Sequence, residues 1–179
     1  DRRGRTKMKI NRSFTNSIKS RFFINETNSK GFMLTTDTNG DVVYIPDRGK
    51  VSKTSFKKWQ DEPWFEYIDL DNNTGEDFLF LSDNSLIAWD RYKKTIFSRD
   101  LLKSKYKKPV LCRTANGDIY VFTVNKNHKK IIIQTIHGQQ SMESFIGRTE
   151  FFDAERIDNN KHISLFTANE KELYYYHIY

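Results

Sequence analysis

The chain has 179 residues and a net charge of +7, and aromatic side chains occupy 15% of its positions. This length suffices for one domain with a sizeable core, and the aromatic content excludes a disordered chain, because disordered chains lack residues that bury apolar area. The only cysteine, Cys112, excludes an intrachain disulfide and a cysteine zinc site. No apolar run reaches the roughly 18 residues of a membrane-spanning helix, so no membrane span is expected.

The positive charge is spread along the chain as lysine pairs between predicted strands, which is typical of solvated turns. No recognition-helix pattern accompanies it, so nucleic acid is not expected as a partner. The chain starts at Asp1 without Met and shows no signal-peptide pattern. We therefore expect a processed chain or an excised part of a larger protein, and its compartment stays open.

In chain order, Lys7 to Phe14 alternates polar and apolar residues and predicts a first strand. A first repeat of four strands follows, at about residues 21–56. Its predicted strands are Arg21–Ile24, Gly31–Thr36, Asp41–Ile45 and a weaker Lys50–Phe56. A polar loop is expected at Asn25–Lys30, and Asn39-Gly40 predicts a hairpin because both residue types tolerate positive φ.

The second repeat, at about residues 65–99, has the clearest pattern and serves as the template for the others. Its predicted strands are Phe65–Asp69, Asp77–Ser82, Ser85–Trp89 and Thr95–Ser98. An acidic, Asn-rich loop separates the first two strands, and a tight turn separates the second from the third.

The last two repeats are expected at about residues 104–136 and 149–179. The third has an unclear first strand near Lys105–Lys107, and its other predicted strands are Pro109–Thr114, Asp118–Thr123 and Lys129–Ile136. The fourth has predicted strands at Thr149–Arg156, His162–Thr167 and Glu172–Tyr176, with a loop at Ile157–Lys161 and no fourth strand before Tyr179.

The central turns of these repeats carry an asparagine at uneven intervals that average about 43 residues. Four-stranded repeats of this period indicate propeller blades, and no segment has a helical apolar pattern. We therefore predict a single all-β, propeller-like domain over residues 1–179, in four units of about four antiparallel strands. Lys7–Phe14 would complete the last unit and close the ring, since a terminal strand removes an unpaired edge. Half of a larger propeller and a β-sandwich or barrel are the alternatives.

The acidic loop Asp69–Asp77 places oxygen-bearing side chains at alternating positions, as calcium-binding loops do. With its flanking strands it resembles the calcium-loop blades of the FG-GAP/VCBS repeat family, whose pattern is D-x-D-x-[DN]-G-x-x-D. Asp69, Asp71, Asn73 and Asp77 match the ligand positions of that family. The resemblance implies a calcium site and a propeller that serves adhesion, carbohydrate binding or protein binding without catalysis, at the cell surface.

The loop departs from the family pattern in two ways. Thr74 stands where the family has glycine, which here comes one place later at Gly75, and Asn73 replaces a central aspartate. The corresponding loops of the other repeats have lost most carboxylates. A structural interpretation is therefore open as well, in which the Asp and Asn side chains cap the backbone of their own loop.

No enzyme motif is found. The four histidines are spread over the second half of the chain without metal-ligand spacing. Cys112 lies in an apolar run that predicts an inert buried thiol, and Ser82, Ser85 and Ser141 lack a nucleophile-elbow context. The histidines are His128, His137, His162 and His177.

We predict a non-catalytic binding or scaffolding module that contacts other proteins or neighbouring domains. A contact surface is one interpretation of the aromatic cluster Tyr174–Tyr176 with Tyr179, and core packing is the other. The alternatives in function are a carbohydrate-binding, adhesion-type propeller and a degenerate enzyme domain with its site in the central channel.

Overall fold

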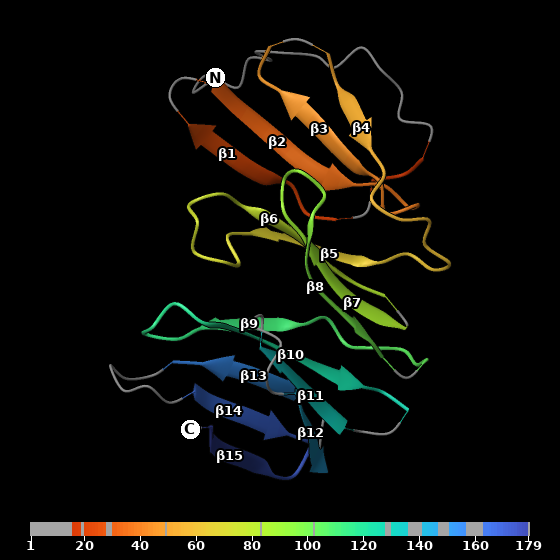
Figure 1. The fold of residues 1–179 in the computed structure, drawn as a ribbon. Coiled ribbons are helices and arrows are strands. Elements are labelled where there is room, and N and C mark those ends of the chain that lie inside the picture. The colour runs from red at the N-terminus through yellow and green to blue at the C-terminus, as the bar shows by residue number, and fades with distance from the viewer. Residues whose placement is uncertain are drawn as a thin grey trace, which may run out of the picture. The chain divides into compact units, whose positions relative to one another are not determined.

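The fold contains only β-strands, confirming the predicted class. The computed structural model describes residues 16–18, 20–27, 30–48, 50–82, 84–101, 103–127, 130–135, 141–146, 151–156 and 163–178. Within these ranges fifteen strands form four antiparallel sheets, and no helix is present (Figure 1). None of these segments could therefore cross a membrane as an apolar helix. The chain divides into two compact units, residues 1–58 and 59–179, which are described separately.

The N-terminal unit contains the first sheet, in the strand order β1-β2-β3-β4. Its strands are β1 (Phe23–Thr27), β2 (Lys30–Thr36), β3 (Val42–Pro46) and β4 (Ser52–Thr54). The predicted loop at Asn25–Lys30 is wrong, because Asn25–Thr27 continues β1 and pairs with β2. The predicted strand Lys7–Phe14 lies outside the described residues.

The second sheet, in the C-terminal unit, has the order β5-β6-β7-β8 and matches the template repeat closely. Its strands are β5 (Trp64–Ile68), β6 (Asp77–Leu81), β7 (Ser85–Trp89) and β8 (Thr95–Asp100). Here the alternation of apolar and polar residues and the short turns were enough to locate the strands. Each strand carries apolar residues that are buried in the fold, such as Phe65, Leu79 and Ile87.

The third sheet differs from the prediction in its strand assignment. Its strands are β9 (Val110–Arg113), β10 (Ile119–Asn125), β11 (Lys130–Thr135) and β12 (Ser141–Ile146), in the order β12-β11-β10-β9. The strand predicted as the second of this repeat, Pro109–Thr114, is therefore its first strand, β9. The fourth strand is Ser141–Ile146, which lies beyond the predicted end of the repeat at residue 136. The segment near Lys105–Lys107 contributes only an isolated bridge between Tyr106 and Asn125.

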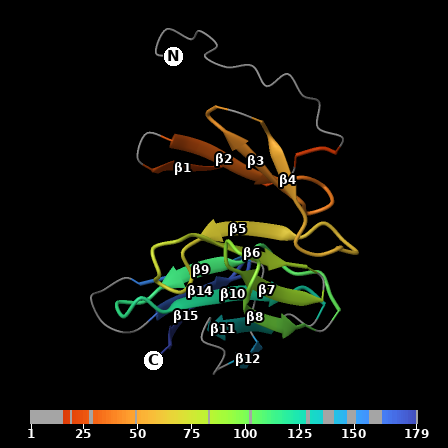
Figure 2. The ribbon, with the colours of Figure 1, turned by 45° about the horizontal axis from the view of Figure 1, so that its top comes forward.

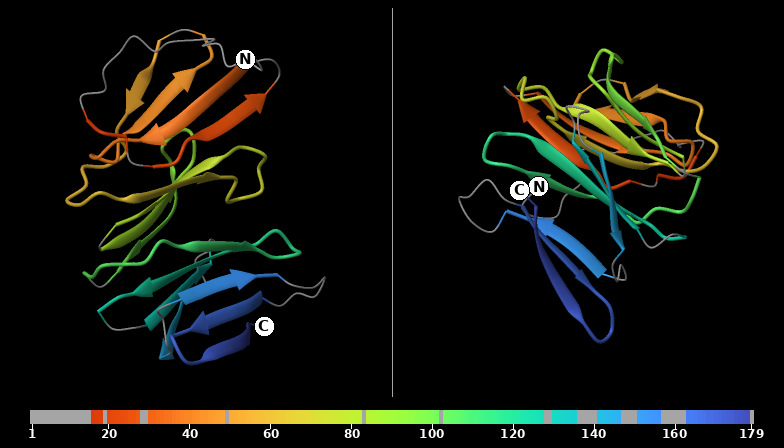
Figure 3. Two further views of the ribbon diagram at one scale, coloured as in Figure 1. Left: turned by 180° about the vertical axis from the view of Figure 1, so that it is seen from behind. Right: turned by 60° about the horizontal axis from the view of Figure 1, so that its bottom comes forward.

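The fourth sheet has three strands, as the sequence predicted. They are β13 (Phe151–Glu155), β14 (Ile163–Ala168) and β15 (Leu173–Ile178), in the order β13-β14-β15. β15 forms one edge of this sheet among the described residues, and Figure 3 shows it on the outer side of β14. No sheet closes into a barrel over the described residues, so ring closure is not shown.

Two apolar cores join the three sheets of the C-terminal unit into layers (Figure 2). One core contains Leu79 and Leu86 from the second sheet together with Ile119 and Val121 from β10. The other contains residues of the third and fourth sheets, among them Phe122, Val124, Ile131, Ile163 and Leu165. Because side chains alternate along a strand, β10 supplies both cores, one from each face.

Three hairpin turns share one backbone geometry that the sequence indicated only in part. In each, the first N–H donates to the fifth C=O and the fourth N–H donates to the first C=O; the turns are Asp37–Asp41, Asp90–Lys94 and Thr114–Asp118. Only the fourth residue has positive φ, which is 74° at Gly40, 89° at Gly117 and 65° at Lys93. The asparagines before the two glycines do not adopt it, although the Asn-Gly pairs predicted both hairpins correctly. This is a three-residue loop that ends on one left-handed residue.

Lys93 occupies the left-handed position that glycine holds in the other two turns. We expect Lys93→Gly to raise the free energy of unfolding by about 0.5–1 kcal/mol, because a Cβ in this conformation costs more than the extra chain entropy of glycine. Urea unfolding measures the change. The matched control is Gly40→Lys, which places a Cβ at the same turn position and should lower stability. Equal effects of the two substitutions would contradict this explanation.

Candidate functional site

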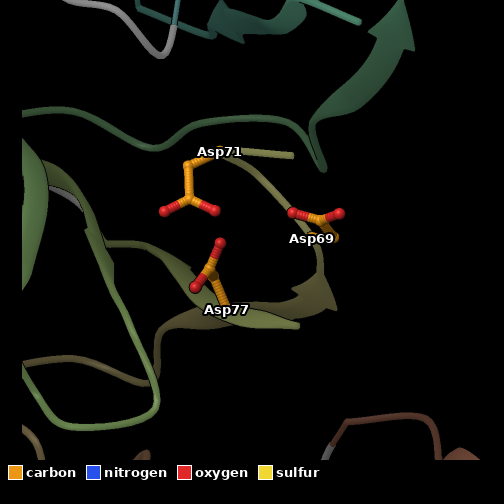
Figure 4. A group of neighbouring side chains, drawn as sticks. All are labelled: Asp69, Asp71 and Asp77. Carbon is orange, nitrogen blue, oxygen red and sulfur yellow. The ribbon is translucent and has the colours of Figure 1, made fainter. Parts of the chain in front are cut away.

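The candidate site is the loop between β5 and β6, where three carboxylates converge. Asp69 follows β5 directly, Asp71 lies within the loop and Asp77 is the first residue of β6. One carboxylate oxygen from each lies within 4.8 Å of the others (Figure 4). The sequence prediction therefore named three side chains that the fold brings together, and all three come from one strand-loop-strand segment.

Leu70 anchors this loop to the protein interior. Its side chain is fully buried in the core between the second and third sheets, and its backbone N–H donates to Asp77 Oδ2 at 2.9 Å. Complete burial of a leucine stabilises by about 2–3 kcal/mol. The loop is thus fixed in its middle by an apolar contact and at its end by a buried hydrogen bond.

Asn73 is placed differently from the three carboxylates. Its Nδ2 donates to Asp71 Oδ2 at 2.8 Å, and its Oδ1 accepts from the N–H of Gly75 at 2.9 Å. The Asn73 N–H also donates to Asp71 Oδ1 at 3.2 Å. These bonds are the loop-capping contacts that the structural interpretation predicted. For Asn73 to ligate an ion beside Asp71, its amide would have to rotate by about 180° and present Oδ1.

The loop holds two strained residues. Asn72 has a φ of 60° and Thr74 a φ of 68°. The left-handed region is tolerable for asparagine but is unusual for a β-branched residue such as threonine. The family pattern has glycine at position 74, and the backbone conformation there is one that glycine adopts without strain. Gly75 in the next position has no positive φ, so its presence does not replace the missing glycine.

Burial and mutual repulsion act on Asp77. Its side chain is only 2% exposed. Burial raises the pKa of this carboxyl to about 6, the charges of Asp71, Asp69 and Asp90 add to the rise, and the hydrogen bond from the Leu70 N–H opposes it. No salt bridge reaches the three carboxylates from any described residue. At neutral pH the loop therefore concentrates negative charge in a partly buried place.

Asp69 supplies an oxygen without a partner. Its Oδ1 is buried and accepts no hydrogen bond from the described residues. An unsatisfied buried oxygen costs about 1–3 kcal/mol, and more when it is charged. Hard oxygen donors of this kind are what calcium prefers. The donor set therefore suits a calcium ion, which Asp69, Asp71 and Asp77 would hold together with main-chain carbonyls and water.

A clamp that the sequence did not predict ties the loop to the third sheet. Arg113, at the end of β9, donates to the backbone oxygen of Asp69 and to Asn72 Oδ1. Asn72 Nδ2 in turn donates to the Gly117 oxygen at 3.2 Å. A Cβ at Gly117 would lie 2.7 Å from Asn72 Nδ2, so it would displace this amide from its contact with the turn, and the φ of 89° favours glycine as well. No sequence signal links positions more than forty residues apart in this way.

The other candidate residues that the structure describes do not come together in a second cluster. Cys112 is buried in β9, and burial raises the pKa of its thiol, which agrees with the expected inert side chain. Ser82 and Ser85 hydrogen-bond to each other at 2.9 Å across the turn between β6 and β7. His177 is exposed and contacts Tyr175. The remaining histidines, the Ser141 side chain and Tyr179 lie outside the described residues.

Comparison of the chain with known protein families, with curated proteins and with solved structures gives no match. The resemblance to calcium-loop propeller repeats therefore stays a prediction. Function has to be inferred from the geometry of the described residues.

The raised pKa of Asp77 predicts an unusual pH dependence in metal-free protein. The folded state binds a proton near pH 6 and the unfolded state near its ordinary value of 3.8, so the contribution of Asp77 to stability is present below pH 4 and is lost as pH rises through 6. The loss is on the order of 2 kcal/mol. In Asp77→Asn, whose Oδ1 still accepts from Leu70, this loss should be absent.

Urea unfolding in a chelator between pH 4 and pH 7 measures this difference. Subtraction of the variant curve from the wild-type curve isolates Asp77 from the other carboxyls. Parallel curves would show that Asp77 titrates normally in the folded protein.

Proposed function

We propose that this chain is a non-catalytic module of the β-propeller type that binds other proteins and holds a calcium ion in its β5–β6 loop. The propeller assignment is supported by sheets that follow one another along the chain, each built from neighbouring antiparallel strands, and by face-to-face apolar packing in the C-terminal unit. The first strands of the third and fourth sheets, β9 and β13, lie beside each other. First strands take this position around a propeller axis.

The observation that carries the binding function is an exposed apolar row on the fourth sheet. Phe151, Ala168 and Leu173 are paired directly across β13, β14 and β15. Phe151 is 66% exposed and Leu173 is 71% exposed. Tyr175, in the next row on the same face, is 48% exposed. Contiguous apolar exposure of this kind marks protein contact surfaces.

Charge around this row indicates the chemistry of the partner. The exposed charged residues of the fourth sheet and its β14–β15 turn are mainly acidic: Asp153, Glu155, Glu170 and Glu172, with Lys171. An interface with an apolar centre and a charged rim is typical of protein complexes. We therefore expect a protein partner with an apolar surface and basic residues around it. The acidic rim contrasts with the net charge of +7 of the whole chain.

The tyrosine cluster of β15 was expected to serve either core packing or a contact surface, and its side chains are divided between the two faces of the strand. Tyr174 and Tyr176 are half-buried, and Tyr176 packs against the core between the third and fourth sheets. Tyr175 faces the other way and meets Phe166, with ring centroids 4.9 Å apart. Core packing and a contact surface therefore occupy opposite faces of one strand, as the period of two requires.

Site-specific crosslinking tests the binding surface. A photo-crosslinking amino acid replaces Phe151 in the cells that produce the protein, and the captured protein is purified and titrated. We expect the double substitution Phe151→Ser and Leu173→Ser to weaken binding by about 30-fold or more, the effect of losing central apolar contacts. Both side chains are exposed, so folding should be preserved.

The matched control for crosslinking places the same amino acid at Tyr92, which is 76% exposed in the β7–β8 turn. Identical captured proteins at both positions, or equal affinity of the purified partner for the double variant, would reject the fourth sheet as the contact surface.

The calcium proposal rests on the convergence of Asp69, Asp71 and Asp77 and on the unpartnered oxygen of Asp69. Calcium would neutralise their mutual repulsion and fix the loop that Arg113 ties to the third sheet. The ion would act structurally, since no enzyme motif accompanies the loop.

Calcium in excess should raise the thermal midpoint of the wild-type protein by about 5 °C, the shift expected for saturating a site that exists only in the folded state. Asp71→Asn should abolish the shift. Thr74→Gly should keep it and raise the metal-free midpoint, because glycine relieves the strained φ. The control is Asp47→Asn, which removes an exposed carboxylate outside the loop. If Asp71→Asn retained the full shift, calcium would be bound elsewhere.

A further inference from the structure

A second, separate feature is a cavity of about 340 Å³ between the edge strands β9 and β13. This volume lies at the lower end of the range of small-molecule sites in proteins. It belongs to the junction of the third and fourth sheets. The acidic loop lies at the junction of the second and third sheets, on the other side of β9.

Because successive side chains of β9 and β13 point to opposite faces, those on the facing sides of the two strands meet in the cavity. Cys112 and Ala154 are buried and contribute to the core between the sheets. Thr114 and Arg156 lie two residues further along each chain, so they share the faces of Cys112 and Ala154 and line the same cavity.

Two polar groups of this cavity lack partners. Thr114 Oγ1 is buried and makes no hydrogen bond to a described residue. The guanidinium of Arg156 has no hydrogen bond or ion pair with any part of the described chain. A buried hydroxyl without a partner is unfavourable, and an arginine presents a planar set of donors that matches carboxylate or phosphate oxygens. Both groups can donate to oxygen, so an oxygen-rich, negatively charged ligand would satisfy them together.

The rim of the cavity carries one charge of each sign. Arg113 and Glu155 are exposed and line it. Arg113 donates to the Asp69 carbonyl and the Asn72 amide oxygen of the β5–β6 loop and to the Gly117 carbonyl of the β9–β10 turn, and none of these is a carboxylate that would cancel its charge. Alternation along β13 places Glu155 on the face opposite Arg156, with Asp153 on the same outer face. Glu155 nevertheless lines the cavity, so the charged residues of its lining are two arginines and one glutamate, with a net charge of +1.

We infer that the cavity between β9 and β13 is a binding site for a small organic anion, whose carboxylate or phosphate group is held by the Arg156 guanidinium and the Thr114 hydroxyl. Cys112 and Ala154 form an apolar floor that suits a short carbon skeleton. We propose binding without catalysis at this site, because none of the residues that line the cavity is placed as an activated nucleophile. The burial that raises the pKa of the Cys112 thiol keeps it protonated.

Calorimetric titration of the full chain tests this site with two probes, inorganic phosphate and malonate, at constant ionic strength. We expect saturable binding of at least one probe. Arg156→Gln and Thr114→Val should each weaken it by about tenfold, the effect of losing a hydrogen bond to a charged group. Valine has the shape of threonine, so Thr114→Val should fold. The control is Arg48→Gln, which removes the same charge from an exposed arginine outside the cavity and should leave the affinity unchanged.

The single cysteine provides an independent readout. Cys112 is 5% exposed and lines the cavity, so a bound anion should slow its alkylation by a small neutral reagent in the wild type and not in Arg156→Gln. The proposal is overturned if neither probe binds saturably, or if Arg48→Gln weakens binding as much as Arg156→Gln. This test is independent of calcium and of the fourth-sheet surface, so its outcome does not depend on either.

Discussion

Burial on both faces of its central strands is the constraint on which the C-terminal unit depends. β10 illustrates it, because Ile119 and Val121 enter one core while Phe122 and Val124 enter the other. A sheet with two apolar faces needs a packing partner on each face. In this chain both partners are further antiparallel sheets, the second on one side and the fourth on the other. Layering therefore follows from the side-chain pattern. Among the described residues the fourth sheet ends this series of layers with Phe151 and Leu173 exposed, and this outer face is the proposed contact surface.

The acidic loop is a consequence of the same packing. Leu70 extends the apolar core into the β5–β6 connection, and once it is buried the residues on either side must turn back toward β6. Asp69 and Asp71 flank this anchor, so their carboxylates are brought to Asp77 by an apolar contact. Arg113 then joins the loop to the end of β9, which means that the loop and the neighbouring sheet cannot shift independently.

The sequence predicted the strands wherever alternation and turn residues agreed, as in Trp64–Asp100, and it predicted the three converging aspartates from their spacing. It failed where pairing depends on distant segments. Lys105–Lys107 looked like a strand but finds only the end of β10 to pair with, at the Tyr106–Asn125 bridge. Arg113 was missed because its hydrogen bonds reach residues more than forty positions away, which no local pattern encodes.

The loop carries more unfavourable features than a connection between two strands requires. A strand corner capped by its own side chains would be as well served by Asn at position 77, which keeps the hydrogen bond from Leu70 without the charge. Instead three carboxylates repel one another, one of them buried, and Thr74 holds a conformation that suits glycine. Several unfavourable features in one short segment, such as backbone strain and repulsion between like charges, are most often found at functional sites, where a bound ligand offsets their cost. A cation would supply that compensation at neutral pH, whereas a proton on Asp77 supplies it only near pH 6 and below, and this difference is the argument for the proposed metal ion over a purely structural role.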